Sequence, residues 1–338
     1  MSKLGIIQSR GIGDIVIALP IAQYYKDLGN EIYWPICEDF VSHFEATVPW
    51  VTWMPVAVDQ QGQFFLNTPL EALARVGITE EDDILYLYQY LSSVPERTDP
   101  DLFAMMKFDQ YKYAVAGVPF ARKWTLADCI LRDPVREQKL YDQLVTTPRY
   151  MVYQGRASDV EYEIDLSGIE ADVQRIEITE LTDSIFDWLK ILEGAETIVL
   201  IDSVFANLID QLKICEGTPK YYMRKWNRRV DGNPVLLGDW GYIPVEAPPG
   251  VQVQSLADVA GAVARQNQPQ PAGNPAVGAP KPQAGSGGSA QTYSPFGQTQ
   301  GGVPTSFLGA TKQGQQAAEQ AKKINSAQSL LAGLGLRQ

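Results

Sequence analysis

Apolar and polar positions along the first half of the chain predict short buried strands that alternate with helices. Residues 4–7 are predicted to form a strand, and the run from Ile15 to Leu28 is so densely apolar that it predicts a helix packed against a sheet. Gly29 and Asn30 would end this helix. The same patterning predicts further strands at 31–36, 51–58 and 83–90 and helices at 70–76, 99–107, 119–131 and 135–145. Strands that alternate with helices favour a parallel sheet with helices on both faces.

A second cycle of strands and helices begins near residue 149. It comprises predicted strands at 149–154, 173–178, 197–201 and 219–223 and predicted helices at 184–192, from 202 onward and at 255–265. Ser184 and Asp187 resemble a capping pair, and Pro35 places its strand near a sheet edge or at the strand's end. We therefore expect an α/β fold with two Rossmann-like domains, residues 1–147 and 148–265, that face each other across a cleft.

The pattern stops at residue 266. Fifteen of the forty-one residues from 266 to 306 are Gly or Pro, and such a composition predicts a disordered linker because it cannot bury a core. Residues 307–338 regain helical character and are predicted to form a short helix rich in Ala and Gln. A helix of this kind is marginal alone, so we expect it to need a partner, and a partner protein is one candidate.

Composition and charge exclude several classes of protein. The net charge of −12 argues against a broad surface for nucleic acid, which would need clustered cations. No run of eighteen apolar residues predicts a membrane span, and no signal-peptide pattern precedes the first strand. Three scattered cysteines, Cys37, Cys129 and Cys215, form neither a disulfide framework nor a CxxC site, which favours the cytoplasm. The single histidine, His43, leaves little material for a His-rich zinc site or a Ser-His-Asp triad.

The turn between the first strand and the first helix is a candidate ligand site. Backbone N–H groups at a helix N-terminus can bind a phosphate, and Gly11 and Gly13 would let a ligand approach closely. Asp14 is either the N-cap of the helix or a catalytic base. The turn also half-matches the dinucleotide fingerprint GxGxxG, with Val16 at the third glycine and either Glu38 or Asp39 as the ribose-binding acid.

A second junction of strand and helix lies at Asp202-Ser203. Together the two junctions resemble the heptosyltransferase-like (family 9) glycosyltransferases of the GT-B fold, over about residues 1–260. The family's Ser-x-x-Gly-Asp turn is met by residues 9–14, one residue longer, with Pro20 in the following helix. Its second motif, Asp-Thr/Ser-Gly-x-x-His-Leu, is met by Asp202, Ser203 and Leu208. In that motif, Val204 replaces the glycine and Asn207 replaces the histidine.

The resemblance implies an inverting transfer of a sugar from a nucleotide-sugar donor, without a metal or another cofactor. The first domain would take the acceptor, which could be a glycan, a protein or a nucleobase, and the second would take the donor. Asp14 matches the family's catalytic base. The residues expected to bind the donor and its phosphates are Arg10, Gly11, Gly13, Gln154, Gly155, Arg156, Asp202, Ser203 and Asn207. A basic run, Arg224, Lys225, Arg228 and Arg229, either reaches a phosphate or an anionic acceptor or forms a solvated loop.

Three other functions stay open. The altered second motif and the unusual tail are also compatible with a non-catalytic GT-B-like binding or structural protein that is recruited through its tail helix. The half-matched fingerprint alone would suit an NAD-binding oxidoreductase. Nucleotide-sugar epimerases share the same two-domain layout.

Overall fold

A computed structural model describes residues 2–80, 83–89, 105–156, 170–224 and 234–243, together with positions 99, 102, 161, 162, 164 and 166. Several of the predictions lie outside these residues. They are the linker at 266–306, the helices at 255–265 and 307–338, much of the helix at 99–107, and Lys225, Arg228 and Arg229 of the basic run.

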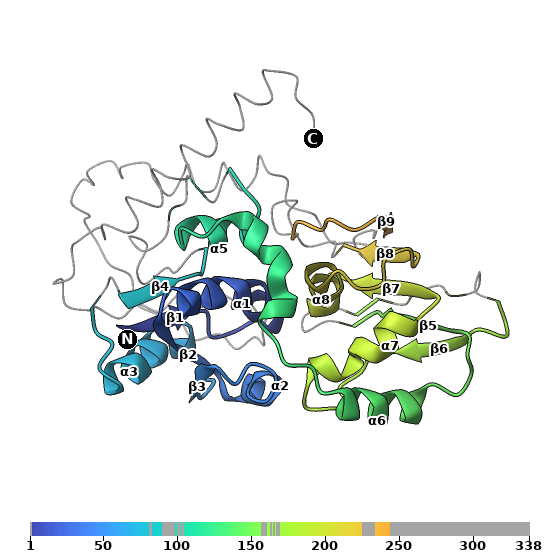
Figure 1. Ribbon diagram of the computed structural model, residues 1–338, viewed down its shortest axis with the longest axis horizontal. Coiled ribbons are helices and arrows are strands. Elements are labelled where there is room, and N and C mark those ends of the chain that lie inside the picture. The colour runs from blue at the N-terminus through green and yellow to red at the C-terminus, as the bar shows by residue number, and fades with distance from the viewer. Residues whose placement is uncertain are drawn as a thin grey trace, which may run out of the picture. The chain divides into compact units, whose positions relative to one another are not determined.

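The first sheet is parallel throughout, with strand order β3-β2-β1-β4 in the described part of the chain (Figure 1). Its strands are β1 (Ser2–Ile7), β2 (Asn30–Cys37), β3 (Val51–Val56) and β4 (Ile84–Tyr86). The accompanying helices, with η for 3₁₀, are α1 (Ile12–Asp27), η1 (Glu38–Phe40), α2 (Val41–Phe44), η2 (Gln63–Phe65), α3 (Asn67–Arg75), α5 (Phe108–Val115) and η5 (Phe120–Asp128). The unbroken run of buried residues from Ile15 to Ala22 places α1 inside the core, as its apolar density predicted.

The second sheet is also parallel, with order β6-β5-β7-β8-β9 among the described strands. Its strands are β5 (Tyr150–Gln154), β6 (Gln174–Glu177), β7 (Thr197–Ile201), β8 (Lys220–Met223) and β9 (Trp240–Ile243). Its helices are α6 (Pro134–Leu144), η6 (Ile185–Trp188), α7 (Leu189–Gly194) and α8 (Val204–Leu212). Two parallel sheets with intervening helices confirm the predicted α/β class.

The position of Pro35 corrects one of the two alternatives drawn from the sequence. Its strand, β2, lies between β3 and β1, so the prediction of an edge strand is wrong. The alternative, a position near the strand's end, is confirmed because β2 ends at Cys37. The register of β2 with β1 reaches only to Tyr33, so the missing N–H of Pro35 costs no bond to β1.

The expected capping pair is half right. Ser184 is the N-cap of η6 and accepts a hydrogen bond from the Phe186 N–H at 3.4 Å. The carboxylate of Asp187 instead accepts two hydrogen bonds from Arg136 of α6, at 2.9 and 2.8 Å. The ion pair of Asp187 with Arg136 therefore holds α6 against η6. Helix α6 precedes the predicted domain boundary at 147 yet packs against α7 and η6 of the second sheet, and the boundary itself stays a prediction.

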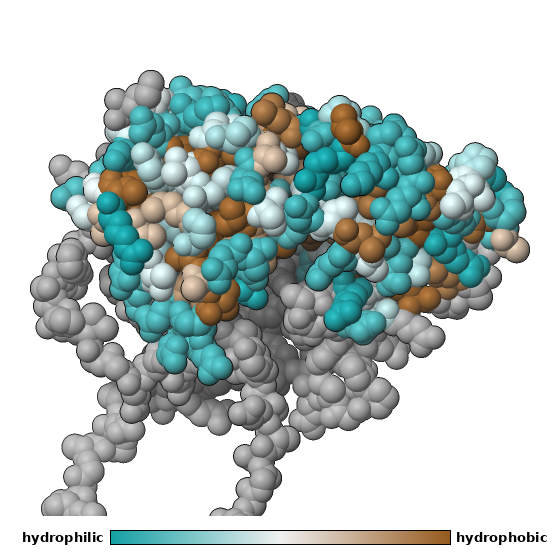
Figure 2. Space-filling view, turned by 90° about the horizontal axis from the view of Figure 1, so that it is seen from below, coloured by the Kyte–Doolittle hydropathy of each residue, from teal (hydrophilic) through white to brown (hydrophobic). Residues whose placement is uncertain are grey.

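The surface in the described ranges is mixed. On the face shown in Figure 2, hydrophobic residues occur singly or in small groups among hydrophilic ones. Scattered apolar side chains of this kind are usual on protein surfaces. Among the helices of the described ranges, none combines the length and the apolar character needed to cross a bilayer.

Candidate functional site

The first junction, from β1 into α1, shows that Asp14 does not cap the helix. The N-cap is Gly11, whose φ of +84° is a conformation that favours glycine, and α1 begins at Ile12. Asp14 lies in the first helical turn, and its carboxylate Oδ1 is 3.1 Å from the Nζ atom of Lys112. The side chain of Asp14 is 37% exposed, whereas that of Lys112 is 2% exposed. The N-cap interpretation is wrong, and a partly exposed carboxylate held by a buried cation is found in its place.

Lys112, on α5, makes two hydrogen bonds and one ion pair at this junction. Its Nζ atom donates to Gln8 Oε1 at 2.6 Å and to the Leu87 carbonyl at 3.1 Å, besides its contact with Asp14. The buried ammonium is thus surrounded by two hydrogen-bonded neutral oxygens and one carboxylate oxygen. Gln8 is itself held, because its Nε2 donates to the Arg10 carbonyl at 2.8 Å.

The other oxygen of Asp14 lies over Gly11. A methyl group added to Gly11 would lie 2.5 Å from Asp14 Oδ2, closer than non-bonded atoms can approach. Gly11 is therefore required by its backbone conformation and also by the space that the carboxylate occupies.

We predict that Gly11→Ala lowers stability more than Gly29→Ala does. Both positions have a positive φ, so each substitution carries a backbone strain of about 1–3 kcal/mol. A methyl group on Gly29 would have nothing within 4 Å, so only the Gly11 variant must also displace a carboxylate. Urea unfolding of the two variants measures the difference in the free energy of unfolding. Equal losses would show that the Asp14 carboxylate moves away from the added methyl group at little cost.

Tyr88 occupies two amides that a ligand could otherwise use. Its hydroxyl oxygen accepts hydrogen bonds from the N–H groups of Ser9 and Arg10, both at 3.0 Å. Burial raises the pKa of the Tyr88 phenol, so this partner stays neutral. The Ser9 hydroxyl in turn donates to the Phe64 carbonyl. The amides of Ser9 and Arg10 are thus used by the protein itself, and a phosphate would need other donors.

The side chain of Arg10 lies against two aromatic rings, and its Nη1 atom is buried without a hydrogen-bond partner among the described residues. Its guanidinium lies over the rings of Phe40 and Phe64, with 5.4 and 5.6 Å to the ring centroids. Its nearest carboxylate, that of Asp39, is 3.7 Å away. Both members of this ion pair are half exposed, so the pair is weak, and the two rings define the position of Arg10.

The second junction, from β7 into α8, has polar groups at the start of α8 that a ligand could bind. Ser203 is the N-cap of α8, but its side chain makes no capping bond. Within the described residues, Ser203 Oγ and Asn207 Oδ1 are buried without a hydrogen-bond partner. Asn207 is 3% exposed, and its Nδ2 donates to the Ser203 carbonyl at 3.5 Å. The first amides of α8 have no partner within the helix, so this end can bind an anion.

The two junctions meet. A methyl group added to Gly13 would lie 3.7 Å from Val204 Cα and 3.8 Å from its N atom, so the start of α1 touches the start of α8. Helices α1 and α8 also contact each other. Asp14 is the next residue of α1, and its carboxylate faces Lys112 and the space over Gly11. The adjacent Asp202 is buried at the end of β7, and its N–H donates to the Met223 carbonyl at 2.9 Å.

The remaining predicted residues lie at the end of β5 and directly after it. Gln154 has a buried Oε1 without a partner among the described residues, and it pairs in register with Leu200 of β7. A methyl group on Gly155 would lie 2.5 Å from the Tyr162 carbonyl oxygen, so the chain itself uses the space that a ligand was predicted to use. Arg156 is exposed and forms an antiparallel bridge with Glu161. Of these three residues, only Gln154 has an unpaired buried atom.

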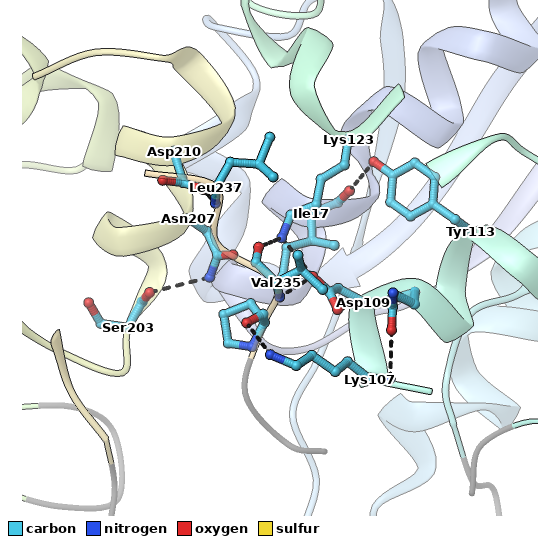
Figure 3. A network of polar contacts seen from close by, with 12 residues as sticks. Ile17, Lys107, Asp109, Tyr113, Lys123, Ser203, Asn207, Asp210, Val235 and Leu237 are labelled. Carbon is cyan, nitrogen blue, oxygen red and sulfur yellow. Dashed lines mark hydrogen bonds and ion pairs between the residues drawn. The ribbon is translucent and has the colours of Figure 1, made fainter. Parts of the chain in front are cut away.

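A buried polar network that the sequence did not predict ties α5 and η5 to residues 234–240 (Figure 3). Asp109 Oδ2 accepts from Lys123 Nζ at 2.6 Å and from the Val235 N–H at 2.7 Å. Lys123 also donates to the Val235 carbonyl at 2.6 Å. The side chains of Asp109 and Lys123 are both 0% exposed, and burial lowers the pKa of Lys123 against the opposing effect of Asp109.

The same segment is fastened to α8 by Asp210. Its Oδ1 accepts from the Gly238 N–H and from Trp240 Nε1, both at 3.0 Å, and its Oδ2 accepts from the Leu237 N–H. Residues 234–240 are thus bound by one buried carboxylate on α5 and another on α8. This segment leads into β9, so the network joins the helices beside the site to the edge of the second sheet.

In the ranges that the structure describes, no group of three or more His, Cys, Asp or Glu side chains is arranged to hold a metal ion. The three cysteines are free and buried. The candidate site is therefore made of a carboxylate, a helix N-terminus and neutral polar side chains.

Comparison with solved structures finds glycosyltransferases. The glycosyltransferase family 9 protein of Veillonella parvula is 12% identical, with a TM-score of 0.45, over 77% of this chain and 91% of that chain. Heptosyltransferase WaaC of E. coli, solved with ADP-2-deoxy-2-fluoro heptose, is 14% identical, with a TM-score of 0.39, over 79% and 100%. TibC of enterotoxigenic E. coli, described as an iron-containing dodecameric glycosyltransferase, is 10% identical, with a TM-score of 0.44, over 74% and 63%. No protein-family model and no curated protein matches the sequence.

Proposed function

We propose that this chain is a glycosyltransferase that moves a sugar from a nucleotide-sugar donor to an acceptor hydroxyl. One observation carries the proposal: the first turn of α1, which bears the partly exposed carboxylate of Asp14, contacts the N-terminus of α8 where Gly13 meets Val204. A transfer of this kind needs a base for the acceptor and positive potential for the leaving phosphate, and the two junctions supply one each.

The proposed reaction is a single inverting displacement. The acceptor oxygen attacks the anomeric carbon of the donor while Asp14 Oδ2 takes the proton of its hydroxyl. The bond between the anomeric carbon and the β-phosphate oxygen breaks, and the nucleoside diphosphate leaves with the bonding electron pair. The first amides of α8 and the Ser203 hydroxyl stabilise the negative charge on the leaving phosphate, a task that positive helix ends can perform. Asn207 and Gln154 supply neutral polar atoms at the same edge, for the sugar or the nucleotide.

A thermal-shift panel tests this function. The panel contains ADP-, UDP- and GDP-linked sugars, with ADP-heptose among them, the free nucleoside diphosphates, and NAD(H). A ligand at 100 times its Kd adds about 2.7 kcal/mol of stability, so we expect at least one nucleotide sugar and its diphosphate to raise the melting temperature. A shift with NAD(H) and with no nucleoside diphosphate would favour the oxidoreductase instead.

A non-catalytic binding protein is the second candidate, because Val204 and Asn207 depart from the family's second motif. Both candidates predict donor binding, so the distinguishing measurement is slow hydrolysis of the bound donor, with water in place of the acceptor. Release of nucleoside diphosphate above the rate in buffer supports the transferase, whereas binding without release supports the second candidate. The free, buried cysteines support a reducing compartment such as the cytoplasm for either function.

A further inference from the structure

Lys112 is a buried cation that the proposed chemistry does not use. Burying an ammonium is costly unless it is paired and hydrogen-bonded. An apolar side chain at this position of α5 would avoid that cost. The three acceptors that surround Lys112 therefore indicate what the residue does.

Those acceptors come from three different elements. Gln8 follows β1, Leu87 follows β4, and Asp14 belongs to the first turn of α1. The carboxyl ends of parallel strands lie at one edge of a sheet, so Lys112 joins this edge to the helix that begins there. Two of the partners are neutral oxygens of the scaffold, and the third is the proposed base.

No other cation is positioned to hold Asp14 in the described part of the site. Arg10 is the nearest basic residue in sequence, but it lies between two phenylalanine rings and faces Asp39. Gly11 has no side chain, and the helix cap leaves the Asp14 carboxylate without a capping role. The orientation of this carboxylate thus depends on Lys112.

We propose that Lys112 is a positioning residue for the catalytic base. It fixes Oδ1 of Asp14, which leaves Oδ2, the oxygen over Gly11, to receive the proton of the acceptor. The inference rests on the proposed function. Without the ammonium, the Asp14 side chain would spread over several staggered rotamers. Because misplacing a catalytic group by about 1 Å can cost about 100-fold in rate, the turnover number should fall although Lys112 itself touches no substrate.

The test is a double-mutant cycle of Lys112→Met and Asp14→Asn, read as donor turnover. The donor is the nucleotide sugar with the largest shift in the thermal panel. We expect Lys112→Met to lower kcat by about tenfold or more, with donor Kd unchanged. In the Asp14→Asn background, the same substitution should change kcat little, because the group that it positions is already disabled.

A matched control separates positioning from lost stability. Lys123→Met also removes a buried, ion-paired lysine, but Lys123 is bound to Asp109 and Val235 and not to Asp14. It should lower the melting temperature and keep kcat, measured well below that temperature. If Lys112→Met does not fold, Lys112→Gln keeps two N–H donors for Gln8 and Leu87 and is expected to lose kcat in the same way.

The outcomes distinguish a failure of the positioning role of Lys112 from a failure of the proposed transferase function. Loss of kcat in Lys112→Met that vanishes in the Asp14→Asn background supports positioning. If Asp14→Asn is slow while both Lys112 variants keep the parent kcat, the positioning role is overturned and the transferase stands. Equal losses from Lys112→Met in both backgrounds also overturn it, because Lys112 would then act independently of Asp14. If the parent protein binds donors and never turns them over, the proposed function fails and the inference falls with it.

Discussion

Replacing Asp109 with Asn should lower the free energy of unfolding by about 3–5 kcal/mol, because it leaves a buried charge without its counter-ion. Lys123 is 0% exposed and donates to the Asp109 carboxylate at 2.6 Å. An amide in place of the carboxylate removes the negative charge. Lys123 and the Val235 N–H both donate to Oδ2, whereas Oδ1 accepts from the Gln110 N–H, so in either orientation the N–H₂ group faces a donor. Guanidinium unfolding of residues 1–338 measures the loss.

Two further variants show whether the buried charge is the cause. Glu71→Gln breaks the ion pair with Arg75, in which both side chains are at least 68% exposed, and should cost at most about 0.5 kcal/mol. Adding Lys123→Met to Asp109→Asn should restore part of the stability, because the unpaired ammonium is then gone. If the double variant is instead less stable than Asp109→Asn, by as much as Lys123→Met alone destabilises the parent, the unpaired ammonium does not explain the loss in Asp109→Asn.

Asp14→Asn should lower donor turnover by about 10²–10⁴-fold, the usual contribution of general acid–base catalysis. The amide keeps the size of the side chain and an oxygen that can accept from Lys112, but it cannot take a proton. Because Gly11 is the N-cap, no capping bond is lost, but the buried ammonium of Lys112 loses its counter-ion, so the melting temperature should fall while the donor Kd stays close to that of the parent. Donor hydrolysis, or transfer once an acceptor is found, measures the effect.

The matched control is Asp27→Asn, at the exposed opposite end of the same helix. It makes the same chemical change far from the site and should turn over donor at the parent rate. Full activity in Asp14→Asn would remove Asp14 from the mechanism and with it the proposed base.

The parts of the site that could be predicted from the sequence are those in which adjacent residues carry the signal. The turn from Gly11 to Asp14 and the junction at Ser203 each consist of a strand, a short turn and an apolar helix in direct succession. Periodicity and glycine placement therefore identify them, whereas the contact of Gly13 with Val204 is known only from the structure.

The rest depends on contacts between residues far apart in the chain. Lys112 is separated from Gln8 by 104 positions, and Asp109 from Val235 by 126. In the sequence, α5 is a short segment with Asp, Gln and Lys, a composition typical of a solvated surface, so neither its helix nor its buried charges were predicted. Gly155 is a further example, because its close approach to the Tyr162 carbonyl oxygen joins residues that no sequence pattern pairs, and its role in donor binding stays a prediction.

Titration of a nucleoside diphosphate into the parent protein and Val204→Pro tests the central claim most directly. Val204 is the first residue of α8, a position where proline is tolerated, and Ser203 before it is already extended, with φ −147° and ψ 176°. The substitution therefore removes one N–H from the proposed phosphate site and keeps the helix. A hydrogen bond to a charged group contributes about 1.5–3 kcal/mol, so calorimetry should show the diphosphate bound about 10- to 100-fold more weakly, with unchanged binding of the unphosphorylated nucleoside. Equal affinity for the diphosphate in both proteins would contradict the account, because the start of α8 would then not hold the leaving group.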